Sequence, residues 1–239
     1  MQQLMAEARR WQLSAALDQR SLDGGEQIDQ WDRSLSTALR YGITPQVEVN
    51  ATYRRGSSEL RVPGIGGEVF EDASRRSSLE LGANWLARGE DEWPALLLAA
   101  RVVSLAEQAG ERARFPSFTV GATTYRSIDP VVLSLRVAYT QRAAFTRGGE
   151  RLDGGGSWQL EPLVNFAVNP RVTLIGGFTL GRNSDPRVNG QRRITRRYPM
   201  ALRVGLGFAP TARSTVFLSG DLAGSGRSSG LSLRWFQQF

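Results

Sequence analysis

Residues 130–145 read PVVLSLRVAYTQRAAF and alternate between two kinds of side chain. The odd-numbered positions from 131 to 139 carry large apolar side chains. The even-numbered positions from 134 to 142 carry small or polar ones, including Arg136 and Arg142. Because successive side chains of a strand point to opposite faces, this segment predicts a strand with one apolar and one polar face.

The same alternation recurs along the chain and predicts about twelve strands. The predicted strands lie within residues 10–18, 34–42, 47–55, 77–86, 93–106, 117–126, 130–145, 157–168, 171–181, 191–208, 212–222 and 231–239.

The connections between these strands alternate between short and long. Tight turns are expected at residues 43–46, 88–94, 127–130, 169–170 and 209–212. Loops rich in Gly, Ser, Arg and Asp lie between them, and the longest spans residues 56–76. Strands of about 9 to 14 residues with this alternation are typical of transmembrane β-barrels. We therefore predict an all-β chain, a transmembrane antiparallel up-and-down β-barrel of about 12 strands over residues 11–239.

A soluble β-sandwich or lipocalin-like barrel would show the same periodicity, with the apolar face turned to a core. The long strands, the small residues on the polar face and the alternating connections favour the membrane. A soluble basic protein that binds nucleic acid would gather its Arg residues in one patch. Here they are scattered along the chain, so no nucleic-acid partner is expected.

The composition excludes several kinds of chemistry. The chain has no Cys and no His, and we find no pairing of a nucleophile with a base, so we expect neither an enzyme nor a cofactor or metal site. No run of 18 apolar residues is present, so no transmembrane helix is expected. All 30 basic residues are Arg, and the formal net charge is +7.

Charged residues on the polar face of the predicted strands are candidates for lining the lumen. They are Arg40, Arg101, Arg136, Arg142, Arg193, Arg197, Arg203, Arg213, Arg234, Glu48, Glu80, Glu161 and Asp221. This set holds nine Arg and four acids, which predicts a lumen that favours anions. The alternative is that the Arg residues pair with the acids and simply fill a narrow barrel.

The chain ends LSLRWFQQF, and one parity of this segment is apolar: Leu231, Leu233, Trp235 and Phe239. The end LRWFQQF resembles the C-terminal signal of outer-membrane barrel proteins, which the barrel assembly machinery recognises. This resemblance implies a last strand that pairs with the first. It also implies a barrel in the bacterial outer membrane, in contact with its lipid and lipopolysaccharide.

Residues 38–56, ALRYGITPQVEVNATYRRG, resemble a strand–turn–strand unit of the outer-membrane transporters associated with meta-pathway phenol degradation. In that family, YG(I/L)T precedes a short periplasmic turn. The functional-amyloid secretion channel of pseudomonads is similar to the family and is a trimeric twelve-stranded barrel with a plugging helix. The resemblance implies a channel for an exported polypeptide or a small anionic solute, with a homotrimer as one oligomeric state.

Residues 1–10 precede the predicted barrel. Leu4, Ala8 and Trp11 have helical spacing, which predicts either a short helix or a lead-in without regular structure. Such a helix could plug the lumen. An even strand number places both termini at the periplasmic end, which fits a helix there. We therefore predict an outer-membrane channel that moves solutes or an exported polymer. The alternative is a non-conducting barrel that serves as an anchor or adhesin.

Overall fold

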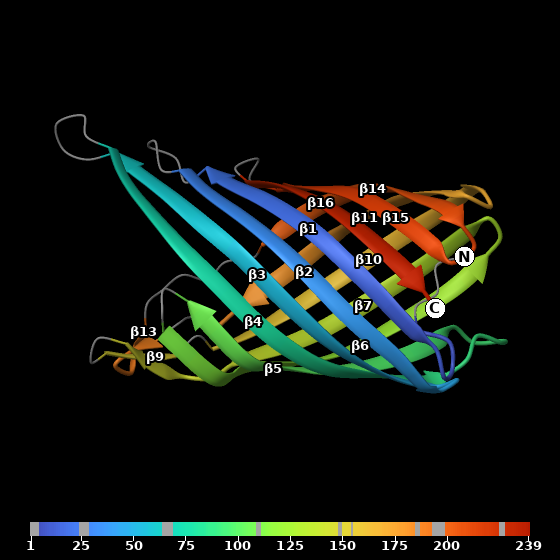
Figure 1. The fold of residues 1–239 in the computed structure, drawn as a ribbon, viewed down its shortest axis with the longest axis horizontal. Helices are drawn as coiled ribbons and strands as arrows, with labels where there is room; N and C mark the ends of the chain where they lie inside the picture. The colour runs from blue at the N-terminus through green and yellow to red at the C-terminus, as the bar shows by residue number, and fades with distance from the viewer. Residues whose placement is uncertain are drawn as a thin grey trace.

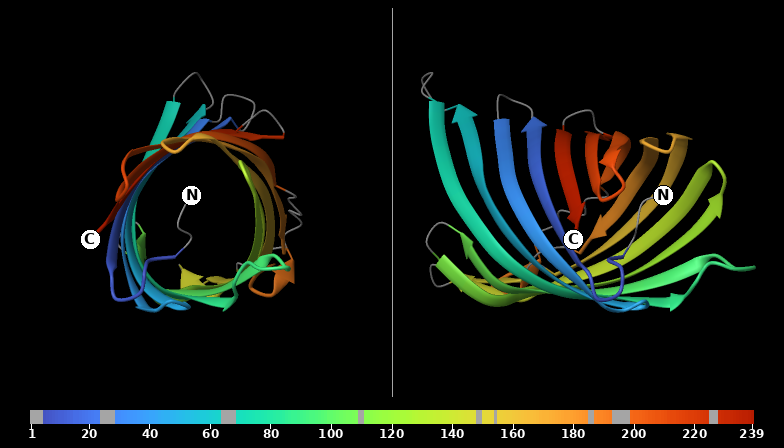
Figure 2. Two further views of the ribbon diagram at one scale, coloured as in Figure 1. Left: turned by 90° about the vertical axis from the view of Figure 1, so that its right-hand side faces the viewer. Right: turned by 45° about the vertical axis from the view of Figure 1, so that its right-hand side comes forward.

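Twelve antiparallel strands close into a barrel (Figures 1 and 2). The computed structural model describes residues 5–23, 29–63, 69–108, 111–147, 150–153, 155–184, 187–192, 199–224 and 228–239. The barrel strands are β1 (Trp11–Asp23), β2 (Asp29–Thr44), β3 (Val47–Pro63), β4 (Val69–Arg88), β5 (Ala95–Gln108), β6 (Glu111–Ile128), β7 (Val131–Arg142), β10 (Gly156–Asn169), β11 (Val172–Asn183), β14 (Met200–Thr211), β15 (Ser214–Ala223) and β16 (Ser228–Gln238). Within these ranges, no helix has the length and hydrophobicity that a membrane crossing requires. The predicted fold class is confirmed.

The last strand closes the barrel against the first. β16 pairs with β1 in a register that sets Leu233 opposite Leu17, and on its other side it pairs with β15. The backbone N–H of Phe239 donates to the Trp11 carbonyl at 3.0 Å. Both edges of the C-terminal ribbon are therefore satisfied, as a barrel in hydrocarbon requires.

The apolar parity of the strands faces outward. On β7, Leu133 and Leu135 are 44% and 39% exposed, whereas Ala138 on the opposite parity is 4% exposed. The buried side chains include Glu48 and Glu161, so the interior is polar and the outer surface apolar. A soluble barrel has the reverse arrangement, and the sandwich or lipocalin-like alternative is therefore wrong.

The connections fall at two ends, which we call the turn end and the loop end. Five short connections follow β2, β4, β6, β10 and β14 at the turn end, as predicted. Side chains fix two of them: Thr44 Oγ1 accepts from the backbone N–H groups of Gln46 and Val47, and Asn169 Oδ1 accepts from those of Arg171 and Val172. The last turn lies at residues 212–213 instead of 209–212, because β14 continues to Thr211.

Two regions predicted as loops form strands instead. Within residues 56–76, β3 and β4 remain paired from Gly56 opposite Arg76 to Pro63 opposite Val69. Beyond the hydrocarbon both faces of a strand may be polar, so polarity alone does not mark the end of a strand. At the loop end, a second sheet has the order β13-β12-β9-β8. Most of it comes from predicted loops, whereas residues 191–192 were predicted as the start of a barrel strand that instead begins at Met200. Its strands are β8 (Phe145–Arg147), β9 (Glu150–Asp153), β12 (Arg187–Val188) and β13 (Gln191–Arg192).

Candidate functional site

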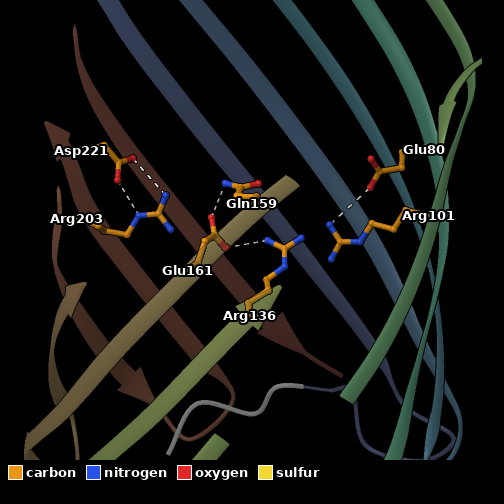
Figure 3. Close-up of polar contacts among 7 residues, drawn as sticks. All are labelled: Glu80, Arg101, Arg136, Gln159, Glu161, Arg203 and Asp221. Atoms are coloured by element: carbon orange, nitrogen blue, oxygen red, sulfur yellow. Dashed lines mark hydrogen bonds and ion pairs between the residues drawn. The ribbon is translucent and has the colours of Figure 1, made fainter. Parts of the chain in front are cut away.

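Three ion pairs bridge neighbouring strands on the inner wall of the barrel (Figure 3). The Arg136 guanidinium lies 3.1 Å from the Glu161 carboxylate, and the two residues are directly opposed between β7 and β10. Arg203 Nε lies 2.7 Å from Asp221 Oδ1, in direct opposition between β14 and β15. The register of the sheet therefore creates two of the pairs.

The third pair joins β4 and β5 on another part of the wall. Arg101 Nη1 lies 3.9 Å from Glu80 Oε1, a looser contact than the other two. The second oxygen of Glu161 accepts a hydrogen bond from Gln159 Nε2 at 2.8 Å, so this carboxylate is held on both sides. Arg101 Nε is buried and has no partner among the described residues. A buried donor of this kind needs water or a solute in the lumen.

Positive charge exceeds negative charge on this wall. Arg101 is close enough to Arg136 and Arg40 to feel their electrostatic repulsion (Figure 3 shows Arg101 and Arg136 pointing toward one another). Arg234 is likewise within reach of Arg203, Arg40 and Arg54, with Asp18 as its attractive neighbour. The Arg40 guanidinium sits 5.8 Å from the centroid of the Phe236 ring, within the range of a cation–π contact.

The segment Met5–Arg10 lies against the inner wall at the turn end. Its residue Ala6 is 5% exposed, and the Ala6 backbone N–H donates to Glu48 Oε2 at 2.5 Å. The other oxygen of Glu48 accepts from Asn84 Nδ2 at 2.7 Å, and Glu48 itself is 0% exposed. Glu48 thus joins the N-terminal segment to β3 and, through Asn84, to β4.

Gly42 forms the second attachment of the same segment. The Arg9 N–H donates to the Gly42 carbonyl at 2.7 Å, and the Gly42 N–H donates to the Arg10 carbonyl at 3.2 Å. A Cβ at position 42 would lie 2.2 Å from the Glu7 carbonyl oxygen, so only glycine permits this approach. The described residues 5–10 contain no helical turn, and the predicted helix is absent from them. Residues 1–4 lie outside the described residues.

A cavity of about 730 Å³ lies beside this segment, inside the turn end of the barrel. Met5 and Ala6 line it together with Leu97, Tyr125, Phe217 and Phe236, so much of its wall is apolar. Phe217 and Phe236 meet edge to face, with ring centroids 5.8 Å apart. Gln12 Oε1 and Gln238 Nε2 are buried here without a partner among the described residues. The cavity therefore offers both apolar surface and free hydrogen-bonding groups.

The remaining predicted residues are less closely grouped. Arg142 is exposed near the loop end of β7. Arg213 was expected on a strand but lies in the turn before β15, where it lines the cavity. Arg193 and Arg197 lie outside the described residues. That these residues line a functional pore stays a prediction.

The predicted assembly signal is on the outer surface. Leu231, Leu233 and Trp235 of β16 point outward, and Phe239 is 63% exposed just beyond the strand. Its recognition by assembly machinery stays a prediction.

Four residues of the turn end are not among the predicted site residues: Gly42, Asn84, Phe217 and Phe236. Asn84 lies within the predicted strand 77–86 on the parity of Glu80, and Gly42 lies within the stretch 38–56 that carries the resemblance. Phe217 and Phe236 share parity with polar neighbours such as Ser219 and Arg234, and this parity was the available signal that both rings face inward.

No protein-family model and no curated protein matches the chain. Among solved structures it is similar to an outer-membrane channel from Pseudomonas putida F1, with a TM-score of 0.80 and 12% identity over 100% of both chains. It is also similar to the transport unit of the autotransporter AIDA-I from Escherichia coli, with a TM-score of 0.63 and 10% identity over 99% of this chain and 92% of that one. The NanC porin aligns with a TM-score of 0.58 and 11% identity over 94% of this chain and 98% of that one.

These likenesses define the class of fold: the chain has the fold of outer-membrane β-barrels. The three named neighbours are a channel, a transport unit and a porin. The narrower likeness to the transporters of phenol degradation and to the amyloid secretion channel stays a prediction.

Proposed function

We propose that the protein is a bacterial outer-membrane channel whose Arg-lined lumen favours small anionic solutes. The observation that carries this proposal is the excess of Arg over acids on the inner wall, where Arg40 and Arg234 face no carboxylate within ion-pair distance in the described residues. Such unpaired charge raises the local concentration of anions. In this proposal the turn end and both termini are periplasmic.

The segment Met5–Arg10 narrows the periplasmic mouth in this proposal. Glu48 and Gly42 hold it against the wall, and Met5 and Ala6 line the cavity beside it. The resulting pathway admits small solutes. Export of a polypeptide requires the segment to leave the lumen.

The test is the ion selectivity of single channels formed by the refolded protein in planar bilayers. Replacing Arg40 and Arg234 with Gln removes two positive charges without leaving an ion-paired carboxylate alone, so the preference for anions should fall. Arg171→Gln, in a turn outside the barrel, is the matched control and should leave selectivity unchanged. Equal selectivity in the wild type and the double variant would contradict the role of the wall.

The second candidate is a non-conducting barrel that serves as an anchor or adhesin. The attached N-terminal segment and the second sheet at the loop end favour it. It predicts no conductance from the folded, inserted protein. The conductance of the folded, inserted wild type separates the candidates, because the proposed channel conducts with the segment in place and the anchor does not. Deleting residues 2–10 should then raise the conductance of the channel.

A further inference from the structure

Three Arg residues gather on the outer face of the barrel, on strands β2, β3 and β4. Arg33 and Arg75 both pair in register with Ser57, which lies between them, so the two Arg residues are two strands apart. Arg55 lies on the same face of β3 as Ser57, two residues closer to the turn end, and is opposite Leu35 on β2. Neighbouring strands are about 4.8 Å apart, so Arg33 and Arg75 are separated by about 10 Å at the backbone. All three residues are exposed.

The parity of these positions shows that the side chains point away from the lumen. Arg33 shares its face with Leu35, Arg55 with Tyr53 and Arg75 with Leu79. These three apolar residues are 55%, 50% and 37% exposed on the outer surface. The Arg cluster is therefore distinct from the Arg residues of the inner wall.

The height of the cluster places it at the edge of the apolar band. β4 ends at Arg88, and the outward-facing Trp85 lies three residues before this end. Aromatic side chains at this position are typical of the membrane interface, and Arg75 is ten residues further toward the loop end. Ten residues span about 33 Å of strand, and with a tilt of about 40° this is about 25 Å along the barrel axis. The apolar band of an outer-membrane barrel is also about 25 Å tall. Arg75 therefore lies at the level where lipid headgroups begin.

No protein group in the described residues neutralises the cluster. Arg33, Arg55 and Arg75 form no ion pair or side-chain hydrogen bond there. Glu59 shares the face two residues beyond Ser57, and it forms no ion pair with them. On the inner wall, by contrast, Arg76 at the same height lies 3.6 Å from the Asp32 carboxylate.

A shallow hollow of about 410 Å³ lies over the cluster. Its lining includes all three Arg residues, Ser57, and the apolar side chains of Leu17 and Leu35 on the side toward the membrane centre. The hollow therefore has guanidinium groups on one side and apolar side chains on the other. A phosphorylated lipid at the membrane interface has the complementary arrangement, with an anionic headgroup above its acyl chains.

We propose that Arg33, Arg55 and Arg75 bind the phosphorylated headgroup of lipopolysaccharide, the lipid A phosphates, in the leaflet at the loop end. Guanidinium groups bind phosphate oxygens in paired hydrogen bonds, and three of them around one hollow provide the charge for a doubly charged headgroup. The acyl chains lie along Leu17 and Leu35. This assignment rests on the proposed outward orientation of the loop end but not on conduction through the lumen.

The test measures binding of diphosphoryl lipid A to the folded barrel in detergent micelles. Native mass spectrometry gives the number of lipid A molecules bound to each barrel as the lipid A concentration is raised. The wild type should bind lipid A more tightly than the Arg33→Gln, Arg55→Gln, Arg75→Gln triple variant by about tenfold or more. Arg182→Gln is the matched control, because Arg182 is exposed on the outer face of β11 on the parity of Phe178. This control should bind as the wild type does. The experiment needs no conductance, so it fails or succeeds independently of the proposed channel.

Three outcomes would overturn the proposal. They are equal binding by the triple variant and the wild type, equal binding of dephosphorylated lipid A, and displacement of lipid A by millimolar inorganic phosphate, which would identify a site for free anions. Heat-induced unfolding of the barrel on gels verifies that each variant is folded. If the triple variant does not fold, the single Arg55→Gln variant must weaken binding while Arg182→Gln does not.

Discussion

Glu48→Ala should release the N-terminal segment from the inner wall. Glu48 Oε2 accepts the Ala6 N–H, the bond that ties the segment to β3, and a hydrogen bond to a charged group contributes about 1.5–3 kcal/mol. Loss of about 2 kcal/mol raises the detached population about thirtyfold. The bonds between Gly42 and the segment remain, so detachment stays an equilibrium.

Trypsin cleavage after Arg9 and Arg10 measures this equilibrium, because both residues are held by hydrogen bonds to Gly42 in the attached state. When reattachment is fast, the cleavage rate follows the detached population and should rise about thirtyfold in the variant. Release of the N-terminal peptide is followed by mass spectrometry. Glu80→Ala, which removes a lumen acid that does not contact the segment, is the control. A cleavage rate for Glu48→Ala equal to that of Glu80→Ala would refute the attachment through Glu48.

Three further predictions test other parts of the structure. Leu135→Arg on the outer face should lower the free energy of unfolding in lipid by about 2–4 kcal/mol, whereas Ser134→Arg on the inner face should change it far less. Urea unfolding in bilayers measures both free energies. Equal losses of stability in the two variants would contradict the assigned faces. A double-mutant cycle of Arg203→Gln and Asp221→Asn should give a coupling energy of about 1 kcal/mol, because the pair is partly exposed to the lumen. Additive effects of the two substitutions on stability would show that the 2.7 Å contact contributes nothing. Phe239→Ala should lower the folded fraction in cells without changing the stability of the purified barrel, and Gln237→Ala should do neither; heat-modifiable mobility on gels reports both, and normal assembly of Phe239→Ala would contradict the signal.

The faces of the strands could be predicted because the barrel imposes one strict rule on each position. Leu133 and Leu135 must meet lipid, while Ser134 and Arg136 meet the lumen, and the period of two is visible in the sequence. The positions of the short turns could also be predicted, because Pro and Asn are typical of such turns. The structure has five short turns at one end of the barrel. The lengths of β3 and β4 could not be predicted from the sequence, because the parts of a strand that extend beyond the hydrocarbon need no apolar face.

The pairing of charges could be predicted only in part. Arg136 and Glu161 were both expected to face the lumen, but their contact depends on the register between β7 and β10. Glu48 was expected there too, yet its partner Ala6 is 42 residues away along the chain and reaches it only through the path of the N-terminal segment. A period-two pattern contains no information about that path.

The outer position of each Arg in this cluster could be predicted from the sequence, but the cluster itself could not. Arg55 has the parity of Tyr53, which should have placed it among lipid-facing residues. Its neighbours Arg33 and Arg75 come from other strands, and only the sheet register brings the three together.

The most direct measurement is the reversal potential of wild-type single channels in a tenfold gradient of potassium chloride across a planar bilayer. An Arg-lined open lumen predicts stable conductance steps and a reversal potential whose sign corresponds to chloride carrying most of the current. The proposed anion channel would be contradicted by a reversal potential whose sign corresponds to potassium carrying most of the current. It would also be contradicted by the absence of conductance from protein that is shown to be folded and inserted.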